Sequence, residues 1–412
     1  MLTVLTPEEA AGVICGRFPA LTVPAERVLL GNALGRTLYD DVVSNEFVPG
    51  FDRSTVDGYA VASSDTFGCS ESIPAMLSLS GEVLMGRAAQ GAIMPGTCVS
   101  VSTGGDLPEG ADAVVMLEYA EDYGSGFIGI TSPVAPGNNI IFKGDDVSPG
   151  DMILPAGSVL SPSDIGILAA LGYDSVGVRP RPVVGIISTG DELVAPSEMP
   201  ERGQIRDVNT PLLVAAVEMF GAAPLGYGII CDDESTLRST VLRAVAECDI
   251  VLISGGSSAG MRDLTARVIE SAGEILFHGI AMKPGKPTIL GVINDKPIFG
   301  LPGHPVAAYF VTELFVRLLI SRLMGAEVKR RVISARISEA ISSNHGRAEY
   351  IAVHLVAAEP RNDELRSEFY VARPIRGKSG LITSLAGADG YICIPRDSEG
   401  IARASEVAVT LL

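Results

Sequence analysis

The chain has 412 residues, which at about 100–200 residues per domain predicts about two to four domains, and its 47% of hydrophobic residues can fill several buried cores. Its 49 acidic and 31 basic residues leave a net charge of −18, which argues against nucleic acid or an anionic membrane as the main partner. It has no CxxC pair, no membrane-length apolar run and no basic N-terminal leader, so we expect a cytoplasmic protein without a zinc site or disulfides.

Short elements separated by glycine and proline dominate the first 180 residues. Thr6 and Ser161, each followed by proline, predict the starts of two helices. Short apolar runs in residues 44–140 indicate a β-rich module. We expect the two helices to pack together, so that residues 1–43 and 141–180 form an N-terminal mixed domain and the β-rich module is inserted into it.

Apolar runs alternate with helical patterns over residues 181–326. Near-continuous apolar strands joined by helices are typical of a parallel sheet that is covered on both faces. We expect strands at residues 183–188, 225–230, 250–254, 275–280, 288–292 and 298–301, and helices at 210–220, 235–246, 264–272 and 305–324. Residues 327–412 return to short strands, which favour a small C-terminal barrel or sandwich.

Three of the expected strand ends carry glycine-containing turns. They read STGDE from residue 188, SGGSSAG from residue 254 with Asp263 following, and GLPGHP from residue 300. Ligands of an open α/β sheet bind at the carboxyl ends of its strands, and such turns expose backbone N–H groups that suit a phosphate or an oxyanion. Turns also need glycine for purely structural reasons, but three at one sheet edge favour a binding site. The candidate residues are Glu192, Ser254, Gly255, Gly256, Ser258, Asp263, Pro302 and His304.

Lys283 and Lys286 lie in a turn that two prolines and a glycine stiffen. In a chain of net charge −18, this pair indicates a local anion clamp, and the alternative is a solvated turn.

Further acids stand in polar segments: Asp57, Asp146 and Asp232. Each could serve only as a turn residue or a helix cap. If they converge with Glu192 and Asp263, the set suits Mg²⁺, which is held by a few carboxylates and substrate phosphates.

Read together, these segments resemble the MoeA and gephyrin E-domain family, the molybdopterin molybdenumtransferases. The matching stretches are FDRSTVDGYAV (51–61), STGGDLPEGADAVVMLE (102–118), FKGDDVSPGD (142–151), ISTGDEL (187–193), GQIRDVNTPLL (203–213), ISGGSSAGMRDLT (253–265), MKPGKPTILG (282–291) and GLPGHPVAA (300–308). The resemblance implies four pieces: an N-terminal mixed domain, an inserted β-rich domain, a MogA-like α/β domain with a parallel sheet, and a C-terminal β-barrel at residues 327–412.

The same resemblance implies the last step of molybdenum cofactor synthesis, in which adenylylated molybdopterin and molybdate or tungstate give the cofactor and AMP with Mg²⁺. It implies that the catalytic acids are Asp57, Asp146, Glu192, Asp232 and Asp263, with Asp57, Glu192 and Asp263 on the metal. It implies that Thr103, Lys283, Lys286, Arg347 and Ser379 bind substrate. It also implies a homodimer and a MogA-type adenylyltransferase as a further partner.

The chain departs from the family pattern at several positions. His304 replaces an asparagine, Met261 stands where an acid is frequent, and Lys143 is the only cation left of a basic run. These changes bear on the choice of oxyanion. A second hypothesis is a protein of the same fold that binds or scaffolds the cofactor without catalysis. A generic nucleotide-binding protein is disfavoured, because neither GxGxxG nor a P-loop is present.

Overall fold

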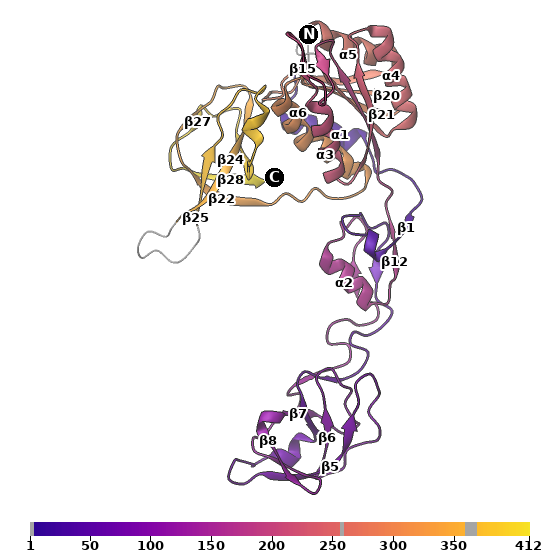
Figure 1. The fold of residues 1–412 in the computed structure, drawn as a ribbon, viewed down its shortest axis with the longest axis vertical. Helices are drawn as coiled ribbons and strands as arrows, with labels where there is room; N and C mark the ends of the chain where they lie inside the picture. The colour runs from indigo at the N-terminus through magenta and orange to yellow at the C-terminus, as the bar shows by residue number, and fades with distance from the viewer. Residues whose placement is uncertain (1–3, 256–258, 359–368) are drawn as a thin grey trace.

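The expected fold class is confirmed, and its pieces follow one another along an elongated molecule. The computed structural model describes residues 4–255, 259–358 and 369–412, with the backbone alone for residues 259–263, 358 and 369. The α/β domain and the barrel lie side by side at one end, a stem of short strands lies in the middle, and the inserted β module lies at the other end (Figure 1). Within the described ranges, no helix has both the length and the apolar character to cross a membrane.

The stem consists of three nested antiparallel strand pairs and one helix. β1 (Glu26–Leu29) pairs with β12 (Ser175–Val178), β2 (Val42–Val43) with β11 (Met152–Leu154), and β3 (Arg53–Ser54) with β10 (Ile140–Ile141). Each outgoing segment therefore pairs with a returning one, and everything between β3 and β10 is an insertion at the tip. Helix α2 (Pro162–Ala170) begins at the predicted Ser161 with a complete capping box.

The inserted module is one six-stranded sheet in the order β7-β4-β6-β5-β9-β8. Its strands are β4 (Gly58–Val61), β5 (Ala75–Val83), β6 (Thr97–Val101), β7 (Ala113–Met116), β8 (Ala120–Gly124) and β9 (Phe127–Ile130). Val114 and Val115, adjacent on β7, belong to different apolar clusters, one on each face of the sheet. The period of two along the strand therefore fills two small cores.

Helix α1 (Pro7–Arg17) begins at the predicted Thr6, but its expected packing against α2 is wrong. Ala10, Ile14 and Phe18 are at most 2% exposed and belong to the main core of the α/β domain, where α1 contacts α7. Helix α2 instead contributes Leu168 to the separate core of the stem. Two short amphipathic helices carry no signal that tells which apolar surface each one covers.

The α/β domain holds a six-stranded sheet in the order β16-β13-β17-β21-β20-β18. Its strands are β13 (Val183–Thr189), β16 (Ala223–Ile230), β17 (Ile250–Gly255), β18 (Glu274–His278), β20 (Ile289–Ile293) and β21 (Lys296–Leu301), and a separate short pair joins β14 (Leu193–Val194) to β15 (Ile205–Arg206). The expectation of a wholly parallel sheet is wrong for β20, which is antiparallel to both of its neighbours. Asn294 and Asp295 both have positive φ, 52° and 60°, so they form the two-residue turn of a β-hairpin.

Helices cover both faces of this sheet, as expected. They are α3 (Asn209–Met219), α4 (Glu234–Glu247), α5 (Ala259–Ala272), α6 (Pro305–Val311) and α7 (Arg317–Leu323), with a π-helical turn at Thr312–Val316 between α6 and α7. Ile250 and Leu252 share a core with α1, α3, α6 and α7. Val251 and Ile253 share the other core with α4 and α5. Alternate residues of one apolar strand thus bury both faces.

The C-terminal strands close into a five-stranded barrel in which β24 pairs with both β25 and β26. They are β22 (Val332–Ile337), β24 (Ala348–Ala358), β25 (Phe369–Pro374), β26 (Gly390–Ile394) and β28 (Glu406–Leu411), with a short pair of β23 (Ile341–Ser342) and β27 (Gly400–Ile401) at one side. β19 (Met282–Lys283), which belongs to the α/β domain, pairs with β24. The barrel is therefore joined to the α/β domain by backbone hydrogen bonds as well as by its linker.

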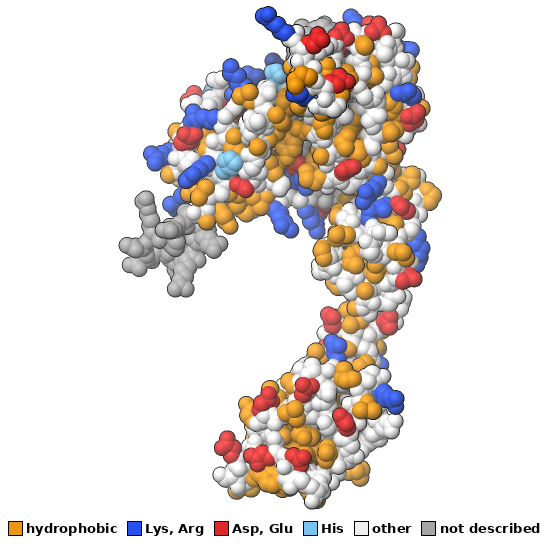
Figure 2. Space-filling view, viewed as in Figure 1, with side chains coloured by type: hydrophobic (Ala, Val, Ile, Leu, Met, Phe, Trp, Pro, Cys, Tyr) orange, Lys and Arg blue, Asp and Glu red, His pale blue; other side chains and the backbone are white. Residues whose placement is uncertain are grey.

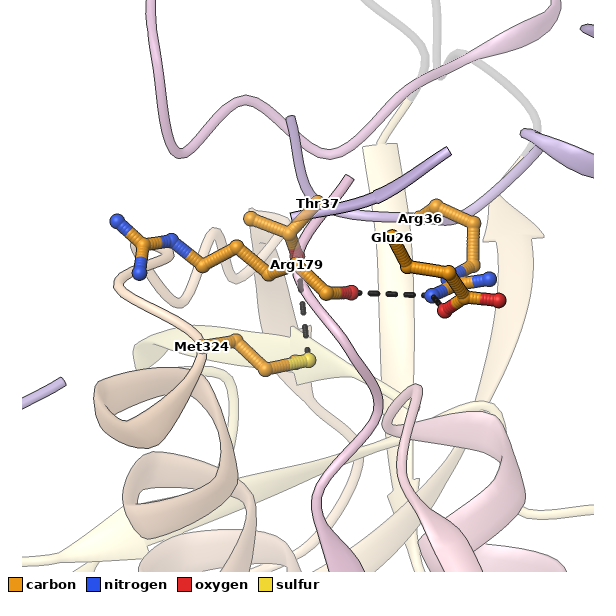
Figure 3. Close-up of polar contacts among 5 residues, drawn as sticks. All are labelled: Glu26, Arg36, Thr37, Arg179 and Met324. Atoms are coloured by element: carbon orange, nitrogen blue, oxygen red, sulfur yellow. Dashed lines mark hydrogen bonds and ion pairs between the residues drawn. The ribbon is translucent and has the colours of Figure 1, made fainter. Parts of the chain in front are cut away.

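A small polar cluster joins the stem to the α/β domain (Figure 3). The buried Arg36 guanidinium pairs with Glu26 and donates to the backbone carbonyl of Arg179 at 3.0 Å. Thr37 Oγ1 lies 3.9 Å from Met324 Sδ, just beyond α7. The hydrogen bond from Arg36 holds the pKa of Glu26 below its ordinary value.

We predict that Arg36→Gln lowers the free energy of unfolding by about 1–2 kcal/mol at pH 7, because Glu26 and the Arg179 carbonyl lose their donor. A lowered carboxyl pKa contributes stability above its unfolded value and loses it as the pH falls through the folded value. The deficit should therefore shrink below the usual glutamate range. Urea unfolding at several pH values measures it, with the exposed Arg27→Gln as the control. A deficit independent of pH would contradict the role of Glu26.

Candidate active site

The sequence predicted three glycine-containing turns at one edge of the α/β sheet, and the strands that precede them lie side by side there. The turns follow β13, β17 and β21, which are parallel neighbours in the sheet. Thr189 is in register with Gly255, and Ser254 with Leu301, so the strands end level with one another. Backbone N–H groups and side chains of different chain segments therefore collect at this edge.

Asn209, the first residue of α3, connects two of these turns. Its Nδ2 donates to Ser254 Oγ at 2.8 Å and to the Gly303 carbonyl at 3.0 Å, and the residue is 7% exposed. Asn209 Oδ1 and Thr189 Oγ1 are buried without a hydrogen-bond partner among the described residues. Buried polar atoms are normally paired, so these two oxygens are suited to accept from a ligand. The sequence analysis did not single out Asn209.

Asp207 orders the start of α3 and was also missed. Its buried carboxylate accepts from the backbone N–H groups of Asn209 and Thr210, both at 3.1 Å, and from Thr210 Oγ1 at 2.6 Å. Thr210 Oγ1 also lies 2.7 Å from Ser188 Oγ on β13. An aspartate two residues before an asparagine at a helix start was the signal available in the sequence.

Acidic side chains gather at the ends of β13 and β16. The backbone N–H of Asp232 donates to Asp191 Oδ1 at 3.1 Å, and Glu192 is half-buried. Loss of water around Asp232 and, after it, the charges of Asp191 and Glu192 raise the pKa of Asp232. Within the described residues, no group of three or more His, Cys, Asp or Glu side chains is arranged to hold a metal ion. The carboxylate oxygens of Asp191, Glu192 and Asp232 are hard ligands that repel one another. They nevertheless fit a hard cation that phosphate groups would help to hold.

Three predicted residues of this edge lie outside the described part of the chain: Gly256, Ser258 and the side chain of Asp263. Asp57 and Asp146 lie on other pieces of the molecule. Asp57, just before β4, accepts from Thr103 N at 2.7 Å and from Thr103 Oγ1 at 3.1 Å, so these two predicted residues do come together. Asp146 is exposed between β10 and β11 of the stem. One chain does not bring the inserted module to the α/β sheet edge (Figure 1).

A second feature is a cavity of about 940 Å³ between the α/β domain and the barrel. Among the residues that line it are six predicted from the sequence: Lys283, Lys286, Pro302, His304, Arg347 and Ser379. His304 Nδ1 lies 2.8 Å from Ser379 Oγ, and Val306 N donates to the Ser379 carbonyl at 3.1 Å. Arg376, Lys378 and Glu349 also line the cavity, and the sequence analysis missed them.

Charge is distributed unevenly between the pieces. Residues 44–140 contain 12 acidic but only two basic residues, whereas five Lys and Arg side chains line the cavity with one acid among the described residues. Figure 2 shows this contrast, with red side chains on the inserted module and blue ones over the barrel. The cavity therefore suits an anion.

These features define a class: a multidomain protein in which the carboxyl edge of an α/β sheet and a basic cavity shared with a β-barrel both suit anionic ligands. Three families match successive parts of the chain: "MoeA N-terminal region (domain I and II)" over residues 5–172, "Probable molybdopterin binding domain" over 185–322 and "MoeA C-terminal region (domain IV)" over 334–412.

Relatives and solved structures agree with these matches. The chain is 33% identical over 392 residues to the molybdopterin molybdenumtransferase of Bacillus subtilis, with 94% of this chain and 90% of the relative covered. The molybdopterin molybdenumtransferase of Staphylococcus aureus is 31% identical, with 95% and 92% covered. A crystal structure of the molybdopterin biosynthesis MoeA protein from Pyrococcus horikoshii superposes with a TM-score of 0.85 at 35% identity, with both chains fully covered. The chain belongs to the MoeA family.

We predict that Gly255→Ala disturbs the candidate sheet edge. An added Cβ would lie 2.1 Å from Thr189 Oγ1 and 2.3 Å from the Thr189 carbonyl oxygen, so β13 and β17 must separate. The free energy of unfolding should fall by about 1–3 kcal/mol. Gly226→Ala on β16, where an added Cβ meets nothing within 4 Å, is the matched control for urea unfolding. Equal unfolding midpoints for the two variants would contradict the close approach.

Proposed function

We propose that this chain is a molybdopterin molybdenumtransferase that converts adenylylated molybdopterin and molybdate, or tungstate, into molybdenum cofactor and AMP. The observation that carries the proposal is the basic cavity, which collects six of the residues predicted to bind the anionic substrates. Family membership and the names of the B. subtilis and S. aureus relatives support the same reaction. We further propose a cytoplasmic enzyme that receives its substrate from a MogA-type adenylyltransferase.

In this proposal, the chain binds the substrate from two sides. Lys283, Lys286 and Arg347 attract and hold the oxyanion, while His304 and Ser379 supply hydrogen-bonding groups. Backbone N–H groups of the glycine turns hold the pterin phosphate, and the unpaired oxygens of Asn209 and Thr189 accept hydrogen bonds from the same ligand.

The carboxylates have a different task from the lysines. Glu192 and Asp232, with Asp263 and an Asp57 supplied by a second chain, would hold Mg²⁺. The metal would supply positive charge against the phosphoanhydride that breaks when AMP leaves. Loss of water and, after it, the charges of Asp191 and Glu192 raise the pKa of Asp232, which supports this assignment, since a nearby cation would stabilise the charged carboxylate.

A homodimer with a shared site completes the proposal. The inserted module carries Asp57 and Thr103 at the end of the molecule opposite to the α/β domain (Figure 1). Its strongly acidic surface complements the basic cavity of another copy. A two-fold axis would let the inserted module of each chain reach the sheet edge of its partner, which gives two equivalent sites per dimer.

We predict AMP release that depends on both molybdate and Mg²⁺. The purified chain is mixed with adenylylated molybdopterin, and AMP is measured with molybdate, with tungstate and after chelation of divalent metal. Chelation should abolish release, and added Mg²⁺ should restore it. Tight molybdopterin binding without AMP release under any of these conditions would favour the alternative of a cofactor-binding or scaffolding protein.

We predict that two inactive variants restore each other. Asp57→Ala and Glu192→Ala, mixed in equal amounts under subunit exchange, should recover about a quarter of the wild-type activity, because half of the dimers then contain one intact shared site. Each variant exchanged with itself is the control. No recovery despite demonstrated exchange would place the whole site within one chain.

A further inference from the structure

Glu349 is the one acidic residue among the described residues that line the basic cavity. Its side chain is 13% exposed, and one carboxylate oxygen lies 2.7 Å from Lys283 Nζ. The other oxygen accepts a hydrogen bond from Ser343 Oγ at 2.7 Å. A carboxylate at this place opposes anion binding, so its presence needs an explanation.

The backbone fixes the pair of Glu349 and Lys283. The two residues are direct register partners in the parallel pairing of β19 with β24. The Ala348 N–H donates to the Ala281 carbonyl at 2.9 Å beside them. This strand pair joins the α/β domain to the barrel and holds the two residues side by side at the wall of the cavity, where the Lys283 side chain is 53% exposed.

Most other cations of the cavity have no such partner. Arg376 pairs with Glu339 at 2.9 Å, and Glu339 does not line the cavity. Lys286, Arg347 and Lys378 make no ion pair with the described residues. Glu349 therefore neutralises one particular lysine of the predicted clamp and leaves Lys286, Arg347 and Lys378 to meet a ligand.

We propose that Glu349 is a resident counter-ion of the basic cavity. Its carboxylate holds the Lys283 ammonium group while the cavity is empty, and a tetrahedral dianion that enters the cavity displaces the carboxylate from Lys283. This inference deepens the proposed function and rests on it. Glu349 is a positioning residue that acts through Lys283. It keeps the ammonium group at the cavity wall, and it lowers the affinity for the anion by the competition that the anion must overcome.

Calorimetric titration of sodium molybdate into the full-length chain tests the proposal. Glu349→Gln keeps the shape of the side chain and removes its charge, so its Kd for molybdate should be about tenfold lower than that of the wild type. Sodium sulfate, which has the same shape and charge, should gain by a similar factor. In the AMP assay, the KM for molybdate should fall while kcat does not rise.

Two controls isolate the contact with Lys283. Glu339→Gln makes the same change in net charge beside Arg376 and should alter the Kd by less than about twofold. Ser343→Ala removes a hydrogen bond to Glu349 but keeps its charge, and should stay near the wild type. In a Lys283→Ala background, Glu349→Gln should produce a smaller gain, because the carboxylate still repels the anion but the competition for Lys283 no longer exists.

Failure of the proposed role of Glu349 can be distinguished from failure of the proposed function. If Glu349→Gln binds molybdate no more tightly than the wild type while AMP release stays dependent on molybdate, the role of Glu349 is refuted and the proposed function stands. A gain that is as large in the Lys283→Ala background as in the wild-type background, or an equal gain in Glu339→Gln, also refutes the competition for Lys283, since either result shows general repulsion. Absence of molybdate binding in both the wild type and Glu349→Gln overturns the cavity assignment and the inference together.

Discussion

The nested strand pairing of the stem is the constraint on which the arrangement of the site depends. Because β1, β2 and β3 pair in order with β12, β11 and β10, the chain leaves along one side of the stem and returns along the other. Backbone hydrogen bonds thus hold the inserted module, with Asp57, at the far tip. The Arg36 cluster sets the other end of the stem against α7. Within one chain, the stem therefore keeps Asp57 far from Glu192 and Asp232 (Figure 1).

A second strand pairing creates the cavity. β19 leaves the α/β domain and adds to β24 of the barrel, which places Lys283 directly beside Glu349. The same contact brings Arg347, which precedes β24, toward the lysine turn. The cavity therefore lies where the main core of the α/β domain continues into the barrel through Ala352 and Tyr391, while the barrel also keeps a core of its own.

Sequence reasoning succeeded where the signal was local. Thr6 and Ser161 are helix caps because each hydroxyl accepts a backbone N–H three residues on, which depends on a few neighbouring residues alone. It failed for α1 and β20, because the helix partner of α1 and the direction of β20 depend on distant segments. The domain boundaries at residues 43, 140, 180 and 326 stay predictions. Segments distant in the chain pair in the stem, and α1 packs in the core of the α/β domain, so the spatial pieces are not continuous stretches of sequence.

By itself, the sequence determined the residue chemistry of this protein: apolar strands that end in glycine turns, a stiff lysine pair, scattered acids and the motifs of its family. These are properties of short segments, which stay the same in any fold that the segments adopt. The tertiary structure alone decided which of them meet. It put Asn209 between two turns, Glu349 on Lys283, and Asp57 far from Glu192. Which residues distant in the chain come together depends on how the segments pack, and a local pattern of residue types does not specify that packing.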